Sequence, residues 1–280
     1  QLNIRICIMP FASRGGFLSQ PAAAAGNTRR VGAASTNASQ TWASGTGPKT
    51  DTSIKKFGTA STNFSVNTYE IYATGGADFM SYGTDDFCIE WWHYIDSLSG
   101  HSASSDMCSL NKSGGMGWRF ARGYNASGLG AGTNAKWINM FARGMADLEA
   151  WDITTGTSGA PWAAGQWYFC VWQRKSGATA FWLDGVLKSV GHTNSGGSGT
   201  RNFSVQTATT PVNLGTADGG NGAGPIHIDE MCWSNTWRYA DQSSDLDAIP
   251  SAPFTVDEYT TQLLHMDGAN GGTSWTNATS

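Results

Sequence analysis

The run Phe181–Leu187 constrains the fold of this chain more than any other stretch. An apolar segment leads into Asp184 and Gly185, and a second apolar segment leaves them. Asp-Gly between two β-type segments is among the strongest short-range signals of a β-hairpin, because both central positions of the turn favour positive φ. The run therefore predicts two antiparallel strands joined by a two-residue turn.

Two further runs predict central strands. Phe87–Ile95 is β-branched and aromatic without Gly or Pro, and both of its faces carry large side chains, so we expect both faces to be covered. Ile226–Met231 alternates with a period of two. This alternation places Ile228 and Glu230 on one face and Asp229 on the other, so the adjacent carboxylates are expected to point in opposite directions.

Short strands separated by turn signals continue along the chain from Asp51, with almost no convincing helix. The sequence holds 36 Gly, and only 14% of its residues are charged, against roughly 25% in typical globular chains. Such a composition suits many short strands joined by tight turns. We therefore predict an all-β fold, an antiparallel β-sandwich of the jelly-roll type.

The first 50 residues differ from the rest. Residues 2–8 alternate as a lone strand, which needs a partner from elsewhere. Residues 11–50 are rich in Gly, Ala, Ser and Thr, and bury too little apolar surface to offset their ordering entropy alone. We expect residues 1–50 to form an N-terminal arm or linker of low complexity, and residues 51–280 to form the jelly roll, with a polar tail at 271–280. The lone strand also predicts a homo-oligomer, with a trimer favoured.

Charge and cysteine content narrow the function classes. The net charge is −4 and no block of Lys and Arg stands out, so the chain has no nucleic-acid footprint. No apolar run approaches 18 residues, so no membrane span is expected. Five Cys without a Cys-x-x-Cys pair give no zinc signature. Cys88, Cys170 and Cys232 lie in apolar strand runs, and we expect them to be small buried hydrophobes in a protein folded in a reducing compartment.

Nine short segments resemble, in this order, the laminin-G-like, concanavalin A-like jelly rolls of tailed-phage virion proteins. They are Lys56–Gly58, Asp86–Trp92, Trp167–Arg174, Phe181–Gly185, Val212–Gly215, Ile228–Glu230, Trp237–Tyr239, Ala252–Phe254 and Leu263–Gly268. The resemblance covers roughly residues 51–280. It implies a non-enzymatic structural protein on the virion surface, a head decoration or tail-fibre subunit, with residues 1–50 attaching it to other virion proteins. The same fold also hosts lectins and hydrolases.

The 13 Trp residues point to a second function, recognition of host surface glycans. Trp in strand runs is expected to fill the core, whereas Trp nearer loops can stack on sugars or lie in subunit contacts. These candidates are Trp118, Trp137, Trp151, Trp162 and Trp237. The alternative to the virion hypothesis is therefore a lectin-like, carbohydrate-binding module outside a virion.

Some relatives of this fold are hydrolases and some bind calcium. Retaining glycosidases need two carboxyl groups about 5 Å apart. None of the five Glu has a second carboxylate two or four residues away on an evident strand, so no enzyme is predicted. Calcium is held by carboxylates and carbonyls. The candidate ligands are Asp184, Asp218 and Asp229, of which Asp184 also serves as the hairpin residue. No other cofactor is expected.

Overall fold

The computed structural model describes residues 26–34, 41–44, 47–64, 71–73, 82, 85–96, 105–110, 117–122, 138–143, 148–152, 163–188, 191–192, 212–214, 216–217, 221–222 and 226–276. In these ranges every ordered element is a strand, and the strands pair antiparallel. No helix within them is long and apolar enough to cross a membrane. The predicted all-β, antiparallel class is confirmed.

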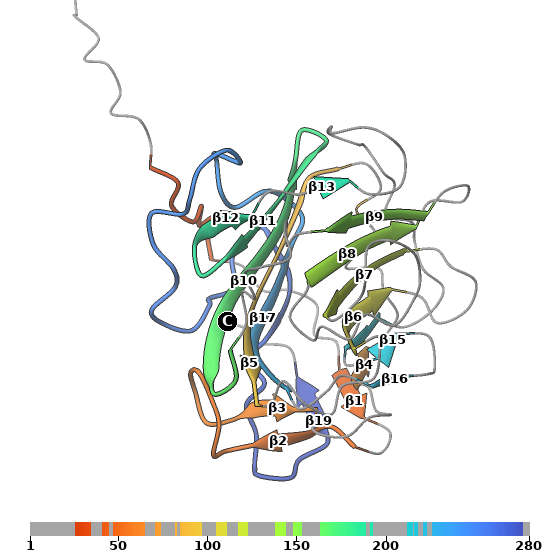
Figure 1. Ribbon diagram of the computed structural model, residues 1–280. Coiled ribbons are helices and arrows are strands. Elements are labelled where there is room, and N and C mark those ends of the chain that lie inside the picture. Colours follow the sequence, from red (N-terminus) through yellow and green to blue (C-terminus); the bar gives the residue numbers. More distant parts are fainter. Residues whose placement is uncertain are drawn as a thin grey trace, which may run out of the picture.

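Two large sheets make up the fold (Figure 1). The nine-stranded sheet has the order β13 (Gly191–His192), β9 (Leu148–Asp152), β8 (Ile138–Arg143), β7 (Gly117–Arg122), β6 (Ser105–Leu110), β14 (Val212–Leu214), β4 (Ile71–Ala73), β1 (Thr41–Ser44) and β19 (Ser274–Thr276). The eight-stranded sheet has the order β12 (Val186–Lys188), β11 (Ala178–Leu183), β10 (Gln166–Lys175), β5 (Phe87–Ile95), β17 (Ile226–Ser234), β3 (Ser61–Asn63) and β2 (Lys49–Asp51), and β18 (Thr260–Leu264) pairs with β17. A small ribbon joins β15 (Thr216–Ala217) and β16 (Asn221–Gly222).

The predicted hairpin joins β11 to β12. Asp184 and Gly185 have φ values of 50° and 78°, the left-handed region that this turn requires. The Asp184 carboxylate also accepts a hydrogen bond of 2.7 Å from the Phe169 amide of neighbouring β10. The turn residue therefore ties its hairpin to the centre of the sheet.

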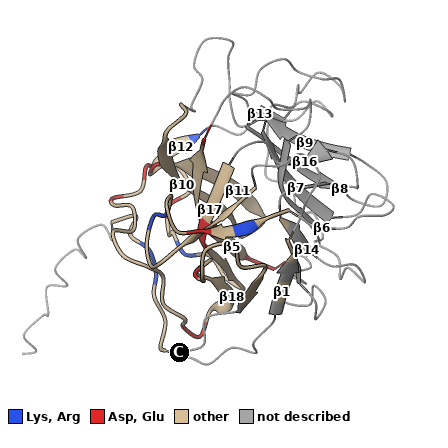
Figure 2. Cartoon of the chain, turned by 90° about the horizontal axis from the view of Figure 1, so that it is seen from below, with Lys and Arg blue, Asp and Glu red and all other residues tan. Residues whose placement is uncertain are grey.

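Large aromatic side chains fill the space between the sheets. Trp42 of β1 stacks on Trp233 of β17, with ring centroids 5.5 Å apart. Trp233 pairs with Ile89 across the sheet, so Ile89 and its alternate neighbours on β5 face the same way. The buried rings of Phe87 and Trp172 meet on this face at 4.8 Å. This layer is the core of the sandwich. Figure 2 shows that Lys, Arg, Asp and Glu make up only a small part of the described chain.

The opposite face of β5 is covered as well, by residues 235–259, which we call the covering segment. Tyr239, Leu246 and Phe254 of this segment pack with Cys88 and Trp92 of β5 in one buried apolar cluster. The prediction that both faces of residues 87–95 are covered is thereby confirmed. Cys88, Cys170 and Cys232 are buried free cysteines, also as predicted.

A β-bulge corrects the expected alternation of β17. The pairing of β17 with β5 shifts between Asp229 and Cys232, and Glu230 has a φ of 51°. A bulge inserts an extra residue and redirects the side chains that follow it. The Glu230 carboxylate accepts a hydrogen bond from the backbone of Phe254, and Asp229 accepts one from Lys56. Asp229 lies opposite Trp92 in the pair with β5, and Phe254, which Glu230 binds, packs in the same cluster as Trp92. Both carboxylates therefore lie on the covered face of the sheet, and the expectation that they point in opposite directions was wrong.

Two segments that we did not expect to be strands belong to the sandwich, one from the predicted arm and one from the predicted polar tail. Thr41–Ser44 forms β1, which pairs with β19 from the supposed polar tail. Trp42 and Trp275, opposite each other in this pair, are 0% and 2% exposed. Each strand has one large apolar residue, too few to produce a recognisable alternation in the sequence. The described residues between 26 and 50 therefore belong to the same domain as the residues after 50. The predicted strand 2–8 lies outside the described residues.

A truncation tests this assignment. A chain that begins at Asp51 lacks Trp42 and the other contacts of residues 26–50, whereas a chain that begins at Gly26 keeps them. Losing a buried Trp costs about 3–5 kcal/mol, a large part of the roughly 5–15 kcal/mol that stabilises a typical domain. We expect cooperative thermal unfolding, followed by circular dichroism, only for the longer chain. Equal melting temperatures for the two chains would contradict this assignment.

Candidate functional site

A carboxylate lies at the centre of the eight-stranded sheet. Glu90 of β5 is 0% exposed among apolar neighbours on the face beneath the covering segment. Arg29 approaches it from the chain before β1, with Nε 2.9 Å and 3.0 Å from its two carboxylate oxygens and Nη2 2.8 Å from Oε2. The hydroxyl of Tyr239, in the covering segment, donates to Oε1 at 2.8 Å. Three distant parts of the chain thus meet at one buried charge.

The charges of this group support one another. Burial opposes the charged form of Arg29, but the adjacent Glu90 carboxylate outweighs it, so the pKa of Arg29 is raised. Burial and the same carboxylate raise the pKa of Tyr239 well above its ordinary value, so Tyr239 remains a donor. A buried ion pair is stable only when its remaining lone pairs are also satisfied, which the Tyr239 hydroxyl does here.

Residues 26–34, which we call the N-terminal segment, run along the covering segment. The Asn27 amide exchanges hydrogen bonds with the backbone of Asp241 at 2.7 Å and 3.1 Å, and the Arg30 amide donates to the Arg238 carbonyl at 2.6 Å. Arg238 itself forms a two-bond ion pair with Asp257, at 2.5 Å and 2.6 Å, that is buried within the covering segment. The two segments are therefore fixed to each other and to the sheet.

A pocket of about 330 Å³ opens between the N-terminal segment and residues 248–255. Its walls are mainly apolar, and Arg29 and Tyr239 contribute to its lining. The apolar side chains are Val31, Ile249, Pro250, Pro253 and Phe254. Val31 and Ile249 are 61% and 39% exposed, two of the three exposed large hydrophobic side chains among the described residues. Hydroxyl groups come from Thr28, Ser251 and Thr255.

A second buried glutamate holds another wall of this pocket. Glu230, at the bulge of β17, accepts the Phe254 amide at 2.8 Å through one oxygen and contacts His265 Nδ1 at 2.7 Å through the other. Hydrogen bonding to Glu230 raises the pKa of His265. The guanidinium of Arg29 lies 4.9 Å above the Phe254 ring. Glu90 and Glu230 thus position facing parts of one pocket.

Among the five predicted Trp candidates, the side chain is described only for Trp237. Its half-buried ring contacts the guanidinium of Arg30 at 4.9 Å and the ammonium of Lys175 at 4.6 Å. Trp118 lies on β7 opposite Ala142, and Trp151 lies on β9 opposite Met140. Trp137 and Trp162 lie outside the described residues. The structure therefore does not bring these five residues into one described surface, and a role for each stays a prediction.

Two of the three predicted calcium ligands have protein partners instead. The carboxylate of Asp229 accepts hydrogen bonds from the backbone amides of Lys56, Phe57 and Glu230. Burial raises the pKa of Asp229 to about 8, against the effect of these donors. Burial lowers the pKa of Lys56, and nearby Asp184 and Asp229 oppose this effect; the Lys56 ammonium lies 3.8 Å above the Trp92 ring.

The described residues contain no group of three or more His, Cys, Asp or Glu side chains that could hold a metal ion. Asp184 and Asp229 fit calcium poorly, because one oxygen of Asp184 and both oxygens of Asp229 already accept hydrogen bonds from backbone amides. Asp218 lies outside the described residues, so its part in a calcium site stays a prediction.

The pocket was not predicted from the sequence, although Glu90 offered a signal. It is the one acidic residue in the apolar run Phe87–Ile95, and a carboxylate in a strand covered on both faces requires a buried partner. Arg29 could not be identified as that partner, because 61 residues separate the two. Ile249 and Phe254 lie in an irregular segment whose path has no periodic pattern.

Two neighbouring arginines provide a matched test. Arg29→Met leaves the Glu90 charge buried without its partner, which should cost about 3–5 kcal/mol of unfolding free energy. Arg30→Met removes a half-buried cation whose contacts are neutral, the Tyr259 hydroxyl and the rings of Trp237 and Tyr259, and should lower the unfolding free energy by about 1 kcal/mol. Urea unfolding of both variants measures the difference. Similar values for the two would contradict the assignment of Arg29 as the buried partner.

The comparisons with known proteins give distant likenesses of structure. No protein-family model matches the chain, and no curated protein matches it in sequence. The binding domain of botulinum neurotoxin serotype D is 10% identical, with a TM-score of 0.48, and the match covers 73% of this chain and 45% of that one. Domain 4 of the extracellular arabinanase AbnA from Geobacillus stearothermophilus, solved with arabinotriose, is 16% identical, with a TM-score of 0.39, and the match covers 66% and 75% of the two chains.

The binding domain of botulinum neurotoxin DC, solved in complex with SialylT, is 9% identical, with a TM-score of 0.45. That match covers 72% of this chain and 44% of the other, so this chain spans less than half the length of the two toxin domains. Each of these three TM-scores is below 0.5.

Proposed function

We propose that this chain is a non-catalytic, carbohydrate-binding module and that its sugar lies in the pocket between the N-terminal segment and residues 248–255. The observation that carries the proposal is the pocket itself, about 330 Å³ with apolar walls and one arginine held in place by a buried carboxylate. Small-molecule sites are commonly of this size, mostly apolar, with a few polar groups in fixed positions.

The lining suits the chemistry of a sugar ring. A pyranose has an apolar face of C–H groups and a rim of hydroxyls. The side chains of Ile249, Pro250 and Pro253 offer apolar surface to the face. Arg29 and the hydroxyls of Thr28 and Ser251 offer hydrogen bonds to the rim. Because Glu90 already balances the charge of Arg29, the pocket favours a neutral sugar over an anionic one.

Binding accounts for this lining better than hydrolysis does. A glycosidase needs two carboxyl groups beside the scissile bond. The side chains that line the pocket include no Asp, Glu, His or Cys among the described residues. Glu90 lies beneath Arg29 and is fully buried, so it serves to hold Arg29 rather than to transfer protons to a substrate.

Filling the pocket should abolish binding. Ala252 is exposed and lines the pocket, so Ala252→Trp places a large ring in the ligand's position without disturbing the core. After a glycan array has identified a neutral ligand, we expect Ala252→Trp to weaken its binding at least tenfold in calorimetric titration, a loss of about 1.4 kcal/mol or more.

The matched control is Ala269→Trp, which makes the same change at an exposed position that does not line the pocket. This variant should bind the ligand within about twofold of the unchanged chain, since it leaves every lining residue in place. Undiminished binding by Ala252→Trp, or no neutral glycan bound on the array, would contradict the proposed site.

The resemblance in sequence to phage proteins motivates a narrower version of the proposal. In it, the module is a virion surface appendage, residues 1–50 attach it to other virion proteins, and three copies assemble. The sequence resemblance alone supports this version. The full chain should then have the mass of a trimer in light scattering and bind isolated virions in fixed stoichiometry, and a chain that begins at Gly26 should bind them more weakly. A full chain that stays monomeric and does not bind virions would contradict it.

A further inference from the structure

We infer that Trp237, Arg30 and Lys175 form a second binding site, which takes an anionic group, a carboxylate or a sulfate ester, carried on a carbohydrate. This cationic site is separate from the pocket, because none of the three residues lines it. That the anion is carried on a carbohydrate rests on the proposed function, whereas the anion site itself does not depend on a neutral sugar in the pocket. In this site Trp237 holds two positive charges beside its ring and does not need to stack on a sugar itself.

Both cations lie over one aromatic ring. The Arg30 guanidinium is 4.9 Å from the centroid of the Trp237 ring, and the Lys175 ammonium is 4.6 Å from it. The two positive charges are therefore within about 10 Å of each other, roughly one Debye length at 0.1 M salt, so they act together on an approaching anion. The negative face of the ring stabilises each cation.

Hydrogen bonds hold both cations in place. Nη2 of Arg30 donates to the Tyr259 hydroxyl at 2.5 Å, and the Arg30 guanidinium lies 4.2 Å above the Tyr259 ring. The Arg30 amide donates to the carbonyl of Arg238 at 2.6 Å, which fixes the backbone beside Trp237. The Lys175 ammonium donates to the Ala240 carbonyl. Such preorganisation lowers the entropy lost when a ligand binds.

The positive charges are not neutralised by ion pairs with described carboxylates. Each ion pair in the described ranges involves other residues, Arg29 with Glu90, Arg238 with Asp257 and His265 with Glu230. Asp241 lies near enough for the charge of Lys175 to act on it weakly, but its Oδ1 already accepts hydrogen bonds from the amide and hydroxyl of Ser243. An incoming anion therefore finds two cations with free donor capacity.

The difference in charge balance between Arg29 and Arg30 indicates which class of ligand the cationic site binds. Arg29 is neutralised by Glu90 and lines an apolar pocket, whereas Arg30, the next residue, keeps its charge at a half-buried Trp. Guanidinium and ammonium groups together bind carboxylate or sulfate oxygens through charge-assisted hydrogen bonds. The site thus fits an acidic residue of a glycan, such as a uronic acid or a sulfated sugar.

The test uses an oligogalacturonate and its methyl ester, which share one backbone and differ in charge, with a sulfated oligosaccharide and inorganic sulfate as further probes. Calorimetry on the full chain should show tighter binding of the acid than of the ester, with the difference falling as salt is raised. Arg30→Gln and Lys175→Gln should each weaken acid binding about threefold, and the double variant about tenfold. Trp237→Leu should also weaken it, because the cations lose their support.

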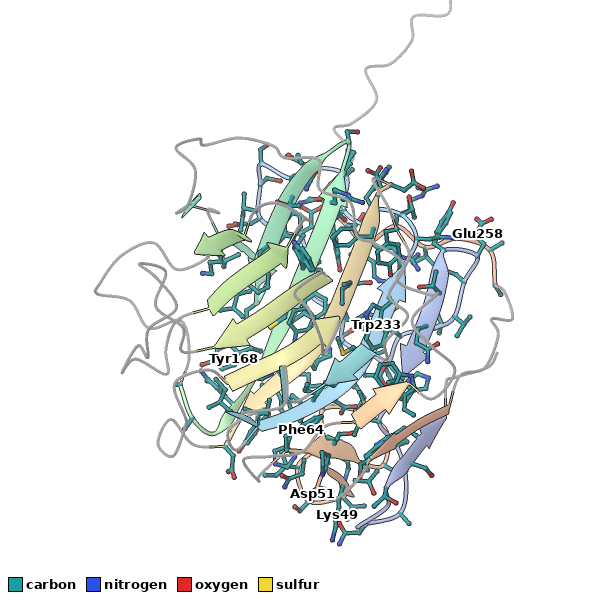
Figure 3. The ribbon with its side chains drawn as sticks, turned by 90° about the vertical axis from the view of Figure 1, so that its right-hand side faces the viewer. Lys49, Asp51, Phe64, Tyr168, Trp233 and Glu258 are labelled. Atoms are coloured by element: carbon teal, nitrogen blue, oxygen red, sulfur yellow. The ribbon has the colours of Figure 1, made fainter. Side chains whose placement is uncertain are left out.

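Lys49→Gln is the matched control, since it removes one exposed positive charge away from the cationic site. Figure 3 shows Lys49 far from Glu258, whose neighbour in the chain, Tyr259, contacts Arg30. It should leave acid binding within about twofold. Equal binding of acid and ester, or equal losses in Lys49→Gln and Lys175→Gln, would overturn the inference. Loss of acid binding in Ala252→Trp but not in the double variant would also overturn it, by assigning the acid to the pocket. Neutral-sugar binding lost in Ala252→Trp would still support the proposed function.

Discussion

The ion pair between Glu90 and Arg29 is the interaction on which the arrangement of this molecule depends. A carboxylate at the centre of a sheet covered on both faces has no access to water, so its charge must be met by the protein. Arg29 meets it from the N-terminal segment and Tyr239 from the covering segment. Both segments are therefore held to the outer face of the eight-stranded sheet by the carboxylate of Glu90, which belongs to the sheet. The buried pair of Arg238 with Asp257 then joins two points of the covering segment to each other.

The two glutamates of the sheet explain why a pocket exists at this position. Glu90 fixes Arg29, and Glu230, redirected by the bulge of β17, fixes the backbone at Phe254. An irregular segment such as residues 248–255 has no ladder of hydrogen bonds to give it a shape, so the sheet supplies anchors through buried acids. Both glutamates accept hydrogen bonds from the residues that form the pocket and its surroundings.

Much of the fold could be predicted from the sequence because the central strands carry strong local signals. The Asp184 and Gly185 turn and the doubly apolar run Phe87–Ile95 need no knowledge of their partners. The strands β1 and β19 could not be found, since each has a single Trp among small polar residues and becomes a strand only because the other lies beside it. The pocket could not be predicted for a similar reason, because its lining comes from residues near 30 and near 250, which are far apart in the sequence. The predicted direction of the Glu230 side chain was wrong because a β-bulge breaks the period-two alternation, and the bulge leaves no signal in the sequence pattern.

A double-mutant cycle on Arg29 and Glu90 tests this account most directly. The unfolding free energies of the unchanged chain, Arg29→Met, Glu90→Gln and the double variant give the coupling energy between the two side chains. We predict a coupling of at least about 2 kcal/mol, with the double variant more stable than Arg29→Met alone, because removing both charges leaves none buried without a partner. A coupling below about 0.5 kcal/mol would show that the two charges act independently, and the account of how the covering segment and the pocket are held would then be wrong.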